Sequence, residues 1–381
     1  MKICFLVQYA HVAGTYFRWH NLAKALQQLG HEVHVYAGDF NTKSEAREEN
    51  REGVSYFITP SSYTTRIFYN PSDPCTGLKR WWNMRGKKYD VFHLFQPFVQ
   101  AYIPWKFLQQ QNPQSVFLYD WDDLWTNGLF REANDLRTKW VHYSVAWLEK
   151  KIPQQANGTT VCSGYLQNLL PTSVTSRVLY NGFWPKKNWP EKASLQEKWK
   201  MNSDAFHLSY IGKTAGELAW IAAGFQAAKT AGLSVQLWIA GPEEAVVQEA
   251  GLWEMEDVHY MGMLTVDEAA SLAGASDLGL IPLEDNAFNQ SRFPIKFFDY
   301  LSVATPVYYS AVGELAIAGK NQIGAYAGPA SQEAWIQQLP TTIAAIQTAP
   351  PKISLTDLEV AYAWPAVAEQ LIQFYKQLAT A

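Results

Sequence analysis

The sequence contains few cysteines, little charge and no long apolar run. Its three cysteines, Cys4, Cys75 and Cys162, lie far apart without a C-x-x-C or Cys/His spacing, so we expect neither a disulfide framework nor a structural zinc site. Charged residues make up 17% of the chain and the net charge is -4, which offers no broad attraction for nucleic acid or an acidic membrane. No stretch approaches the roughly 18 apolar residues of a membrane-spanning helix.

The first residues also lack the features of a secretion signal. Met1–Val7 passes directly into an apolar strand without an h-region and cleavage site. We therefore expect a cytoplasmic protein and leave peripheral contact with the inner face of a membrane open. An aromatic first domain would be the part that touches lipid, although the sequence shows no strongly basic amphipathic helix.

Tryptophan is the abundant residue type. The chain has 16 Trp, and aromatic residues make up 14% of it. Aromatic rings pack well in cores and also cover the C–H faces of sugar rings. We expect most of them to pack in the protein interior and a few to contact a ligand.

Strand and helix patterns alternate along the chain in two successive series. Lys2–Val7, Thr15–Leu29 and Val33–Ala37 predict a βαβ unit, and His207–Ile211 begins the second series. The fold class is therefore α/β, with two Rossmann-like domains facing a central cleft. We place an N-terminal domain at 1–185, a Pro-, Lys- and Trp-rich linker at 186–204 and a C-terminal domain at 205–360. A final helix at 361–381 is expected to return toward the first domain.

In open parallel sheets, ligands bind beyond the carboxyl ends of the strands. His11, Gly14 and Arg18 lie at that edge in the first half. The loop lacks GxGxxG, so a dinucleotide-binding fingerprint is not supported.

Three carboxylates follow another apolar strand. Asp120, Asp122 and Asp123 lie at or just past the end of Val116–Tyr119. One carboxylate could act as a base toward an acceptor hydroxyl, two could hold a divalent cation, and an Asp-rich cap for the next segment is equally compatible with the pattern. The sequence leaves these alternatives open.

The chain is organised around the stretch Asn289–Pro306. Pro294 favours a first helical position and predicts a helix that starts there, with Phe293 at the N-cap. Because phenylalanine has no side-chain acceptor for the first amides, an anion such as phosphate could take that place. An ordinary amphipathic helix with a solvated Lys–Asp pair is the alternative. One face of this helix would carry a cation, a carboxylate and a phenol, from Lys296, Asp299 and Tyr300.

The strands of the second half end in glycine or proline turns. Lys213, the Gly262–Leu264 backbone and the Ser291–Asp299 turn are therefore expected to meet at one crevice. Together they supply cations, free amides and a carboxylate, and this convergence favours a functional site over the ordinary helix.

Three segments resemble a known family. MKICFLVQYAHVAGTYFRWHNLAKALQQLGHEVHVY is similar to its opening strand, glycine loop and second strand, and VLYNGF to its turn before the linker. SRFPIKFFDYLSVATPVYYSAVGE is similar to its donor-site signature. Over nearly the whole chain, the sequence resembles the GT-B fold and the family 4 retaining glycosyltransferases.

This resemblance implies a nucleotide-diphosphate sugar, linked to UDP or GDP, held by the second domain and an acceptor bound by the first. Lys213 and Lys296 would contact the diphosphate, Asp299 the ribose, and the turn of Gly262, Met263 and Leu264 the base. Gly14 would let the first-domain loop approach the donor phosphate. Such enzymes generally need neither a metal nor another cofactor. The donor-binding candidates also include Ser291 and Glu314 from the signature segment.

The chain departs from the family pattern at several positions. Ser291 and Asp299 stand where Glu-x7-Glu is common, and Leu218 replaces a second lysine. Ala304 replaces a glycine. Asp122 and Asp123 occur where many members have His-Asp, and these two are the candidate catalytic residues that would position the acceptor.

The leading hypothesis is transfer of a hexosyl group from a UDP- or GDP-sugar to a sugar or lipid-linked hydroxyl, with retention. The alternatives are a sugar-nucleotide epimerase or hydrolase of the same architecture, and a catalytically silent sugar-nucleotide or glycan-binding subunit. A nucleic-acid partner is not expected.

Overall fold

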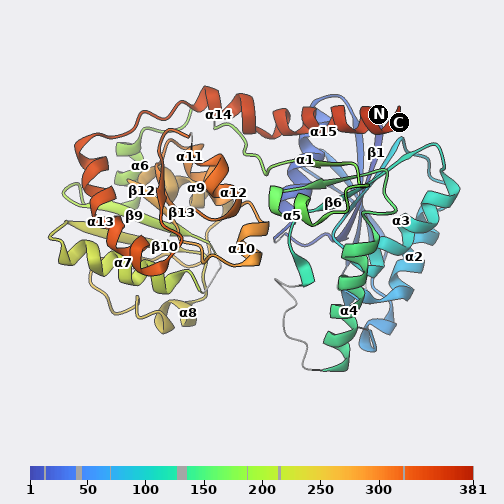
Figure 1. Cartoon of the computed structure of the whole chain (residues 1–381), viewed down its shortest axis with the longest axis horizontal. Coiled ribbons are helices and arrows are strands. Elements are labelled where there is room, and N and C mark those ends of the chain that lie inside the picture. Colours follow the sequence, from blue (N-terminus) through green and yellow to red (C-terminus); the bar gives the residue numbers. More distant parts are fainter. Residues whose placement is uncertain are drawn as a thin grey trace. The chain divides into compact units, whose positions relative to one another are not determined.

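The chain forms two compact units (Figure 1). This computed structural model describes residues 1–12, 14–39, 45–68, 70–126, 135–186, 188–212, 216–320 and 322–380. The N-terminal unit consists of Met1–Asn181 and Trp364–Ala381, and the C-terminal unit of Gly182–Ala363. The last helix of the chain therefore belongs to the N-terminal unit.

An eight-stranded sheet forms the centre of the N-terminal unit, in the order β3-β4-β2-β1-β5-β6-β7-β8. Its pairs are parallel except β3 with β4. Residues Ile3 to Val7 of the central strand are fully buried, as expected for a strand covered on both faces. The strands are β1 (Lys2–Tyr9), β2 (Glu32–Asp39), β3 (Arg47–Arg51), β4 (Val54–Pro60), β5 (Val91–Phe95), β6 (Val116–Trp121), β7 (Gly158–Val161) and β8 (Ser176–Val178).

Helices cover both faces of this sheet (Figure 1). α1 (Tyr16–Gln28) packs beside α15 (Trp364–Ala379), and α2 (Pro74–Met84) beside α3 (Val99–Gln111). The segment between β4 and α2 contains two short 3-10 helices, η1 (Tyr63–Arg66) and η2 (Asn70–Ser72). α4 (Leu136–Lys151) and α5 (Gly164–Leu169) complete the unit.

A six-stranded parallel sheet forms the C-terminal unit, in the order β11-β10-β9-β12-β13-β14. The predicted α/β class with two Rossmann-like sheets is therefore confirmed. The strands are β9 (Phe206–Ile211), β10 (Val235–Ala240), β11 (Val258–Tyr260), β12 (Leu278–Ile281), β13 (Val307–Ser310) and β14 (Ala325–Gly328).

The helices of the C-terminal unit pack on this sheet around a core that includes Trp335. Gly224 lies so close to Leu339 and Trp335 that any larger residue would meet them, and this close approach packs α7 (Leu218–Thr230) against α13 (Gln332–Thr348). The helices are α6 (Lys192–Trp199), α7 (Leu218–Thr230), α8 (Glu244–Glu249), α9 (Val266–Ala275), α10 (Ala287–Ser291), α11 (Lys296–Leu301), α12 (Gly313–Ala318), α13 (Gln332–Thr348) and α14 (Leu355–Tyr362).

Two segments differ from the sequence prediction. Residues 186–204, predicted as a linker, contain α6, whose Gln196 donates to the Ala275 carbonyl at 3.1 Å and whose Lys192 pairs with Asp277. The final helix predicted at 361–381 begins only at Trp364, because the chain is extended at Ala363 (φ -63°, ψ 144°), where α14 ends. Pro365 then occupies the first turn of α15, where its missing N–H needs no partner.

A buried histidine links α15 to the sheet of the N-terminal unit. His93 on β5 is fully buried, and its Nδ1 lies 2.7 Å from the Tyr375 hydroxyl. Burial lowers the pKa of His93 to about 3, while the Asp120 charge acts in the opposite direction. His93 is therefore neutral at physiological pH.

This histidine should make the protein less stable in mild acid. An unfolded histidine binds a proton below about pH 6.5, whereas folded His93 does so only near pH 3. The unfolded state thus gains a proton first, and His93 should lower the free energy of unfolding by up to about 1.4 kcal/mol per pH unit from pH 6 to 4. Urea titrations of His93→Gln should show a shallower slope over that range. A control, His142→Gln on α4, should keep the slope of the natural chain; equal slopes for both variants would contradict the assignment.

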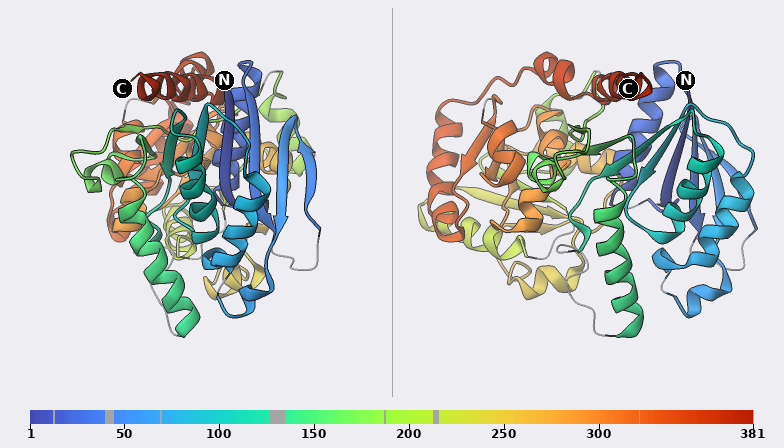
Figure 2. Two further views of the ribbon diagram at one scale, coloured as in Figure 1. Left: turned by 90° about the vertical axis from the view of Figure 1, so that its right-hand side faces the viewer. Right: turned by 45° about the vertical axis from the view of Figure 1, so that its right-hand side comes forward.

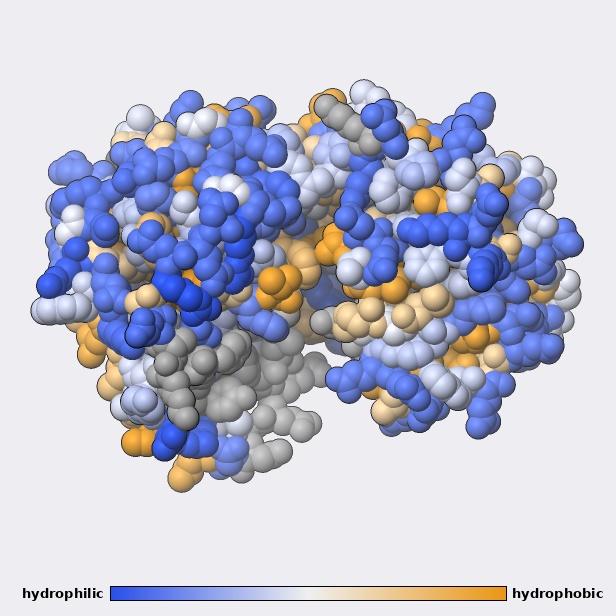
Figure 3. Space-filling view, turned by 180° about the vertical axis from the view of Figure 1, so that it is seen from behind, coloured by the Kyte–Doolittle hydropathy of each residue, from blue (hydrophilic) through white to orange (hydrophobic). Residues whose placement is uncertain are grey.

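One face of the molecule is mainly polar. Hydrophilic side chains predominate on the face drawn in Figure 3, and the hydrophobic ones form small groups. Of the helices in the described part of the chain, none is both long and apolar enough to cross a bilayer.

Candidate functional site

Three glycine turns adjoin one another at the carboxyl edge of the C-terminal sheet. Gly212 follows β9 and donates to the Ala240 carbonyl at 3.0 Å, and Gly241 donates to the Gly262 carbonyl at 2.8 Å. Gly241 has φ +104°, and a Cβ there would lie 2.4 Å from the Gly212 oxygen. Only glycine fits such a position, so these turns lie side by side, as the repeated strand ends predicted.

The turn at Gly262 has one exposed side chain and one packed side chain. Gly262 has φ +65°, and Met263 beside it is 64% exposed. Leu264 packs against a small cluster that contains Trp238 and Leu272. The turn presents its backbone and Met263 to the surface, and its predicted role at the base stays a prediction.

Lys213, the predicted diphosphate ligand after β9, lies outside the described residues. Leu218, which stands where the family has a second lysine, is fully buried in the core of the C-terminal unit. A lysine side chain packed in that direction would lose its contact with water, and burying an unpaired charge costs free energy. The family's second lysine is therefore absent at a position where α7 begins with a side chain that packs into the core.

Two cations gather on one carboxylate at this edge. The Lys296 Nζ lies 2.6 Å from Glu217 Oε2, and the Arg292 Nη2 lies 3.3 Å from Glu217 Oε1. The Tyr210 hydroxyl donates to the same Oε2 at 2.8 Å, and the ammonium lies 4.6 Å from the centre of the Tyr210 ring. We call Lys296, Arg292 and Glu217 the basic cluster.

The basic cluster is suited to a phosphate. It contains two cations and one carboxylate, so a positive charge remains unbalanced within it. The side chains of Lys296 and Arg292 are 16% and 21% exposed, whereas that of Glu217 is 7% exposed. Burial lowers the pKa of Lys296, but the Glu217 carboxylate favours its charged form. A planar guanidinium beside an ammonium can bind phosphate oxygens through several charge-assisted hydrogen bonds.

The helix that carries Lys296 begins later than predicted. α11 starts at Lys296 with Ile295 as its N-cap, not at Pro294 with Phe293 as its N-cap. Phe293 is buried and packs on Phe298 at 5.2 Å between ring centres, which holds it in the core before the turn. Pro294 instead opens a turn, in which its carbonyl accepts from Phe297 N at 3.2 Å. Among the described residues, no side chain caps the first turn of α11.

The predicted polar face of this helix is divided. The Tyr300 side chain is buried, and its hydroxyl donates to the Ser209 carbonyl at 3.1 Å and accepts from Ile211 N at 3.0 Å. Asp299 is exposed. Lys296 pairs with Glu217 rather than Asp299, so the alternative of a solvated Lys–Asp pair is wrong for these residues. The role of Asp299 toward a ribose stays a prediction.

Two further donor candidates lie beside α11 in sequence. Ser291 ends α10 fully buried, and its hydroxyl donates to the Phe288 carbonyl at 2.7 Å. Glu314 is 3% exposed at the start of α12. A Cβ at Gly313, which has φ +53°, would lie 2.7 Å from the Gln290 backbone. The start of α12 therefore lies close to the end of α10. The assignments of Ser291 and Glu314 to donor binding stay predictions.

In the N-terminal unit, Asp120, next to the last residue of β6, forms a buried ion pair. Arg18 Nε and Nη2 lie 2.8 Å and 2.9 Å from the two Asp120 oxygens, and both side chains are buried. Thr160 donates to Asp120 at 2.7 Å, and Arg18 donates to Asn181 at 3.1 Å. Burial disfavours the Asp120 carboxylate, but the Arg18 guanidinium lowers its pKa below the ordinary value. Asp120 and Arg18 are therefore structural.

The next carboxyl group is buried and only partly bonded. Asp122 Oδ1 accepts from Trp125 Nε1 at 3.3 Å, while Oδ2 has no hydrogen-bond partner among the described residues. Burial, and then the Asp123 and Asp120 charges, raise the pKa of Asp122 well above its ordinary value. Asp123 is half-buried. Asp122 is thus a candidate proton-holding group rather than an ordinary surface carboxylate.

The metal alternative finds no geometric support in the described ranges. Among them, no group of three or more His, Cys, Asp or Glu side chains is arranged to hold an ion. The role of Asp122 and Asp123 toward an acceptor stays a prediction.

Glu149 of α4 holds the loop that carries these aspartates. Its carboxylate accepts from Trp121 Nε1 at 3.1 Å, Trp125 N at 2.7 Å and Thr126 N at 3.1 Å. It is 6% exposed. The Thr126 hydroxyl donates to it as well. A buried carboxylate with four donors fixes the backbone around it, so Glu149 positions Asp122.

A cavity of about 90 Å³ lies at the start of α1, in the edge predicted from Gly14. Gly14 adopts φ +56°, with open space around its Cβ position. Gln96 at the end of β5 donates to the Thr15 hydroxyl. The lining residues are Gln8, Tyr9, His11, Thr15, Tyr16, Trp19 and Gln96. The predicted approach of Gly14 to a donor phosphate stays a prediction.

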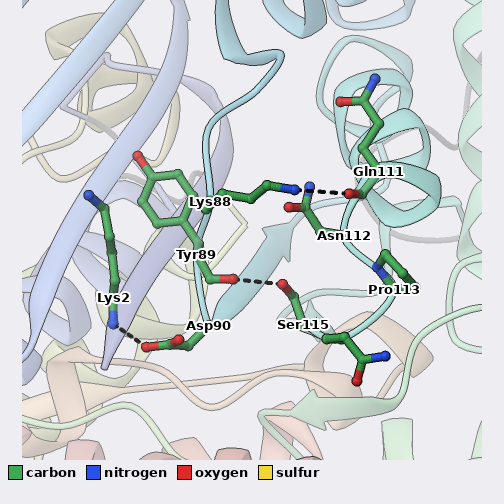
Figure 4. A pocket seen from close by; sticks show the side chains of 9 residues that line it. Lys2, Lys88, Tyr89, Asp90, Gln111, Asn112, Pro113 and Ser115 are labelled. Carbon is green, nitrogen blue, oxygen red and sulfur yellow. Dashed lines mark hydrogen bonds between the residues drawn. The ribbon is translucent and has the colours of Figure 1, made fainter.

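A larger cavity of about 350 Å³ lies at the opposite edge of the same sheet (Figure 4). Its polar groups bond to one another: Lys2 N donates to Asp90 Oδ2 at 2.7 Å, and Ser115 Oγ donates to the Tyr89 carbonyl at 2.7 Å. Lys88 Nζ donates to the Gln111 carbonyl at 3.2 Å. Strands begin at this edge, and ligands of such sheets bind where the strands end, so we assign this cavity no role.

Sequence reasoning missed Glu217, Arg292 and Glu149. Each of them acts on residues distant in the chain, as in the contact of Glu217 with Lys296 across 79 positions. Arg292 follows Ser291 in the signature segment. Because Ser291 stands where a glutamate is common, the sequence did contain a sign that this site is more basic than usual.

Comparisons with known proteins agree with this architecture. Residues 14–185 match the family model described as Glycosyltransferase Family 4. TuaH of Bacillus subtilis (strain 168), provisionally assigned as a teichuronic acid biosynthesis glycosyltransferase, is 25% identical over 205 residues. The aligned part covers 50% of this chain and 49% of TuaH, so the match spans about half the length of that curated relative.

Solved structures share the fold over the whole chain. Sucrose-phosphate synthase of Thermosynechococcus elongatus is 16% identical with a TM-score of 0.72, and the alignment covers 100% of this chain and 99% of that one. HepE of Anabaena, solved with UDP and glucose, is 11% identical with a TM-score of 0.71 and coverages of 99% and 100%. Identities this low establish a common fold.

Proposed function

From the GT-B fold of the whole chain and the Glycosyltransferase Family 4 match of its N-terminal half, we propose that this protein is a glycosyltransferase. The resemblance expected from its motifs is confirmed, and the activity is our inference from it. The proposed reaction moves a hexosyl group from a nucleotide-diphosphate sugar to a sugar or lipid-linked hydroxyl.

The basic cluster is the observation that carries the proposal. Lys296 and Arg292 both pair with the buried Glu217 carboxylate, at the edge where three glycine turns adjoin one another. In glycosyl transfer from a nucleotide sugar, the diphosphate leaves with added negative charge, and preorganised cations stabilise that charge. HepE, which has the same fold, was solved with UDP and glucose, and this supports a UDP-type donor for the C-terminal unit.

The acceptor belongs, in this proposal, to the N-terminal unit. Asp122 offers a carboxyl group with a raised pKa and an oxygen without a partner among the described residues. Such a group can exchange a proton with a hydroxyl at neutral pH. Asp123 is its half-buried neighbour.

We also propose that the reaction retains the anomeric configuration and uses neither a metal ion nor a resident cofactor. The basic cluster supplies the positive charge that a metal would bring to the diphosphate. Retention follows from the family 4 resemblance, and attack would come from the face of the leaving group.

Product analysis with a panel of UDP- and GDP-sugars tests this function most directly. A transferred sugar on an added acceptor, with the anomeric configuration read by NMR, is the expected result. Turnover of donor without acceptor, yielding an epimer or free sugar, would indicate the epimerase or hydrolase alternative. Calorimetric binding of a nucleotide sugar with no turnover under any condition would indicate a silent binding subunit.

Asp122→Asn should separate a proton-transfer role from a packing role. The amide matches the shape of a protonated carboxyl group, so the fold should be unchanged, whereas turnover should fall roughly 100-fold or more because the carboxyl group that exchanges a proton with the acceptor is lost. Donor affinity by calorimetry should stay within about twofold. Asp135→Asn, at an exposed helix cap of the same unit, is the control and should leave turnover intact. An Asp122→Asn enzyme with normal turnover would exclude Asp122 from the chemistry.

A further inference from the structure

The outer face of α4 carries an unusual row of apolar side chains. Leu136, Trp140, Tyr143 and Trp147 follow one another at steps of four, three and four residues, which places them on one side of a helix. They are 85%, 43%, 68% and 55% exposed. We call these four residues the α4 stripe.

The core does not account for the α4 stripe. α4 buries a different face, through Val141, Val145 and Leu148. The helix therefore has two apolar faces, one packed on its own unit and one open. α4 also extends beyond the neighbouring helices of the N-terminal unit at its amino-terminal end, as two views show (Figures 1 and 2).

Basic residues flank the α4 stripe. Arg137, Lys139, Lys150 and Lys151 are all exposed, while the carboxylate within α4, Glu149, is buried and bonded to the loop after β6. This surface is thus positive on a chain whose net charge is -4. The contrast gives the face a defined electrostatic preference for a negative partner.

The neighbouring segment continues this surface. Trp140 Nε1 donates to the Ser72 carbonyl at 3.2 Å, and its ring lies 5.9 Å from that of Phe68. Just before Phe68, Tyr63 and Ile67 are 62% and 67% exposed. The Arg66 guanidinium lies over the Tyr63 ring. This segment therefore adds further aromatic, aliphatic and basic side chains to the surface.

We propose that the α4 stripe lies on the surface of an anionic membrane. Tryptophan and tyrosine favour the water–lipid interface, because their rings are apolar and their N–H and O–H groups remain hydrated. Flanking lysine and arginine add attraction to anionic lipid headgroups. The protein rests on the bilayer through this face.

Charge also distinguishes this partner from a second copy of the chain. Two α4 stripes brought together would place eight basic side chains around one contact, and like charges repel. An anionic bilayer is complementary in both charge and polarity. The inference rests on the α4 surface alone and does not depend on the proposed glycosyl transfer.

Vesicle flotation with the full chain tests this proposal. Vesicles of phosphatidylcholine that contain about 30% phosphatidylglycerol, an anionic lipid, should float together with bound protein at low salt. Leu136→Ser/Tyr143→Ser should lower the partition coefficient at least about tenfold, because two exposed apolar contacts are lost. Lys139→Gln/Lys150→Gln/Lys151→Gln should lower it on the order of 100-fold, and salt should weaken binding of the natural chain.

A matched control uses equally exposed valines of the other unit. Val266→Ser/Val360→Ser removes side chains that are 65% and 76% exposed and should leave partitioning unchanged. The proposal is overturned if the natural chain does not float with anionic vesicles, or if both α4 variants bind as it does. Self-association without lipid that Leu136→Ser/Tyr143→Ser abolishes, seen by sedimentation velocity, would also overturn it and assign the face to a second copy.

Discussion

Replacing Lys296 by alanine should lower kcat/KM for the nucleotide-sugar donor roughly 100- to 1,000-fold, the effect of removing one preorganised group that stabilises charge in a transition state. The Lys296 ammonium belongs to the basic cluster, 2.6 Å from Glu217. Because the negative charge of the diphosphate grows as the sugar leaves, the loss should fall more on kcat than on KM. Steady-state kinetics with the donor identified by product analysis would measure both.

Two variants separate this role from simple charge balance. Lys229→Ala removes another lysine of the C-terminal unit that pairs with a carboxylate, Asp257 at 2.6 Å, and should leave kcat/KM within about twofold, since exposed pairs contribute little. Lys296→Arg keeps the charge and should restore part of the activity. If Lys296→Ala retains full activity, the basic cluster is not the diphosphate site.

The second large effect is expected on stability. Replacing Arg18 by methionine should lower the free energy of unfolding by about 3–5 kcal/mol, because Asp120 would keep a buried charge without its partner. Both side chains of this pair are at most 2% exposed, and two hydrogen bonds join them. Urea unfolding monitored by tryptophan fluorescence would measure the difference.

The pH dependence of this loss has a defined sign. Arg18 lowers the folded pKa of Asp120, so the pair stabilises the natural chain above the unfolded pKa of about 3.9 and loses that effect as pH falls through the folded value. In Arg18→Met the buried carboxyl group takes up a proton more readily. The two proteins should therefore differ most near pH 7 and less toward pH 4.

An exposed arginine provides the comparison. Arg47→Met removes a guanidinium that pairs with Asp39 and Glu49 and is 39% exposed, so the loss should stay below about 1 kcal/mol. Equal losses in the Arg18 and Arg47 variants would show that the buried pair contributes no more than a surface pair.

Local patterns predicted the elements of the fold well and their ends less well. The strand Lys2–Val7 was recognised because burial on both faces requires a continuous apolar run, and β1 extends it by two residues to Tyr9. β3 was missed because Arg47–Arg51 is an edge strand made of polar residues, and its pairing with β4 is a tertiary contact. α6 was missed because a Pro- and Trp-rich flank obscured a short helix.

The sequence left contact with lipid open but indicated no surface for it. An aromatic first domain left lipid contact open, but no helix read as strongly basic and amphipathic. α4 has apolar side chains on two faces. A helix of this kind does not show the one-sided apolar pattern by which an amphipathic helix is recognised in a sequence. Only burial distinguishes the packed side from the open one.

The stretch Asn289–Pro306 shows most clearly what each level decided. The sequence by itself determined the order of strands and helices, the glycine turns and the presence of Lys296 near a helix start, because these depend on neighbours a few residues away. Only the tertiary structure decided that Lys296 meets Glu217 and Arg292, that Tyr300 points into the core, and that Asp120 is held by Arg18. Such pairs lie up to 102 positions apart in the chain, and no local period encodes which charges a folded sheet brings together.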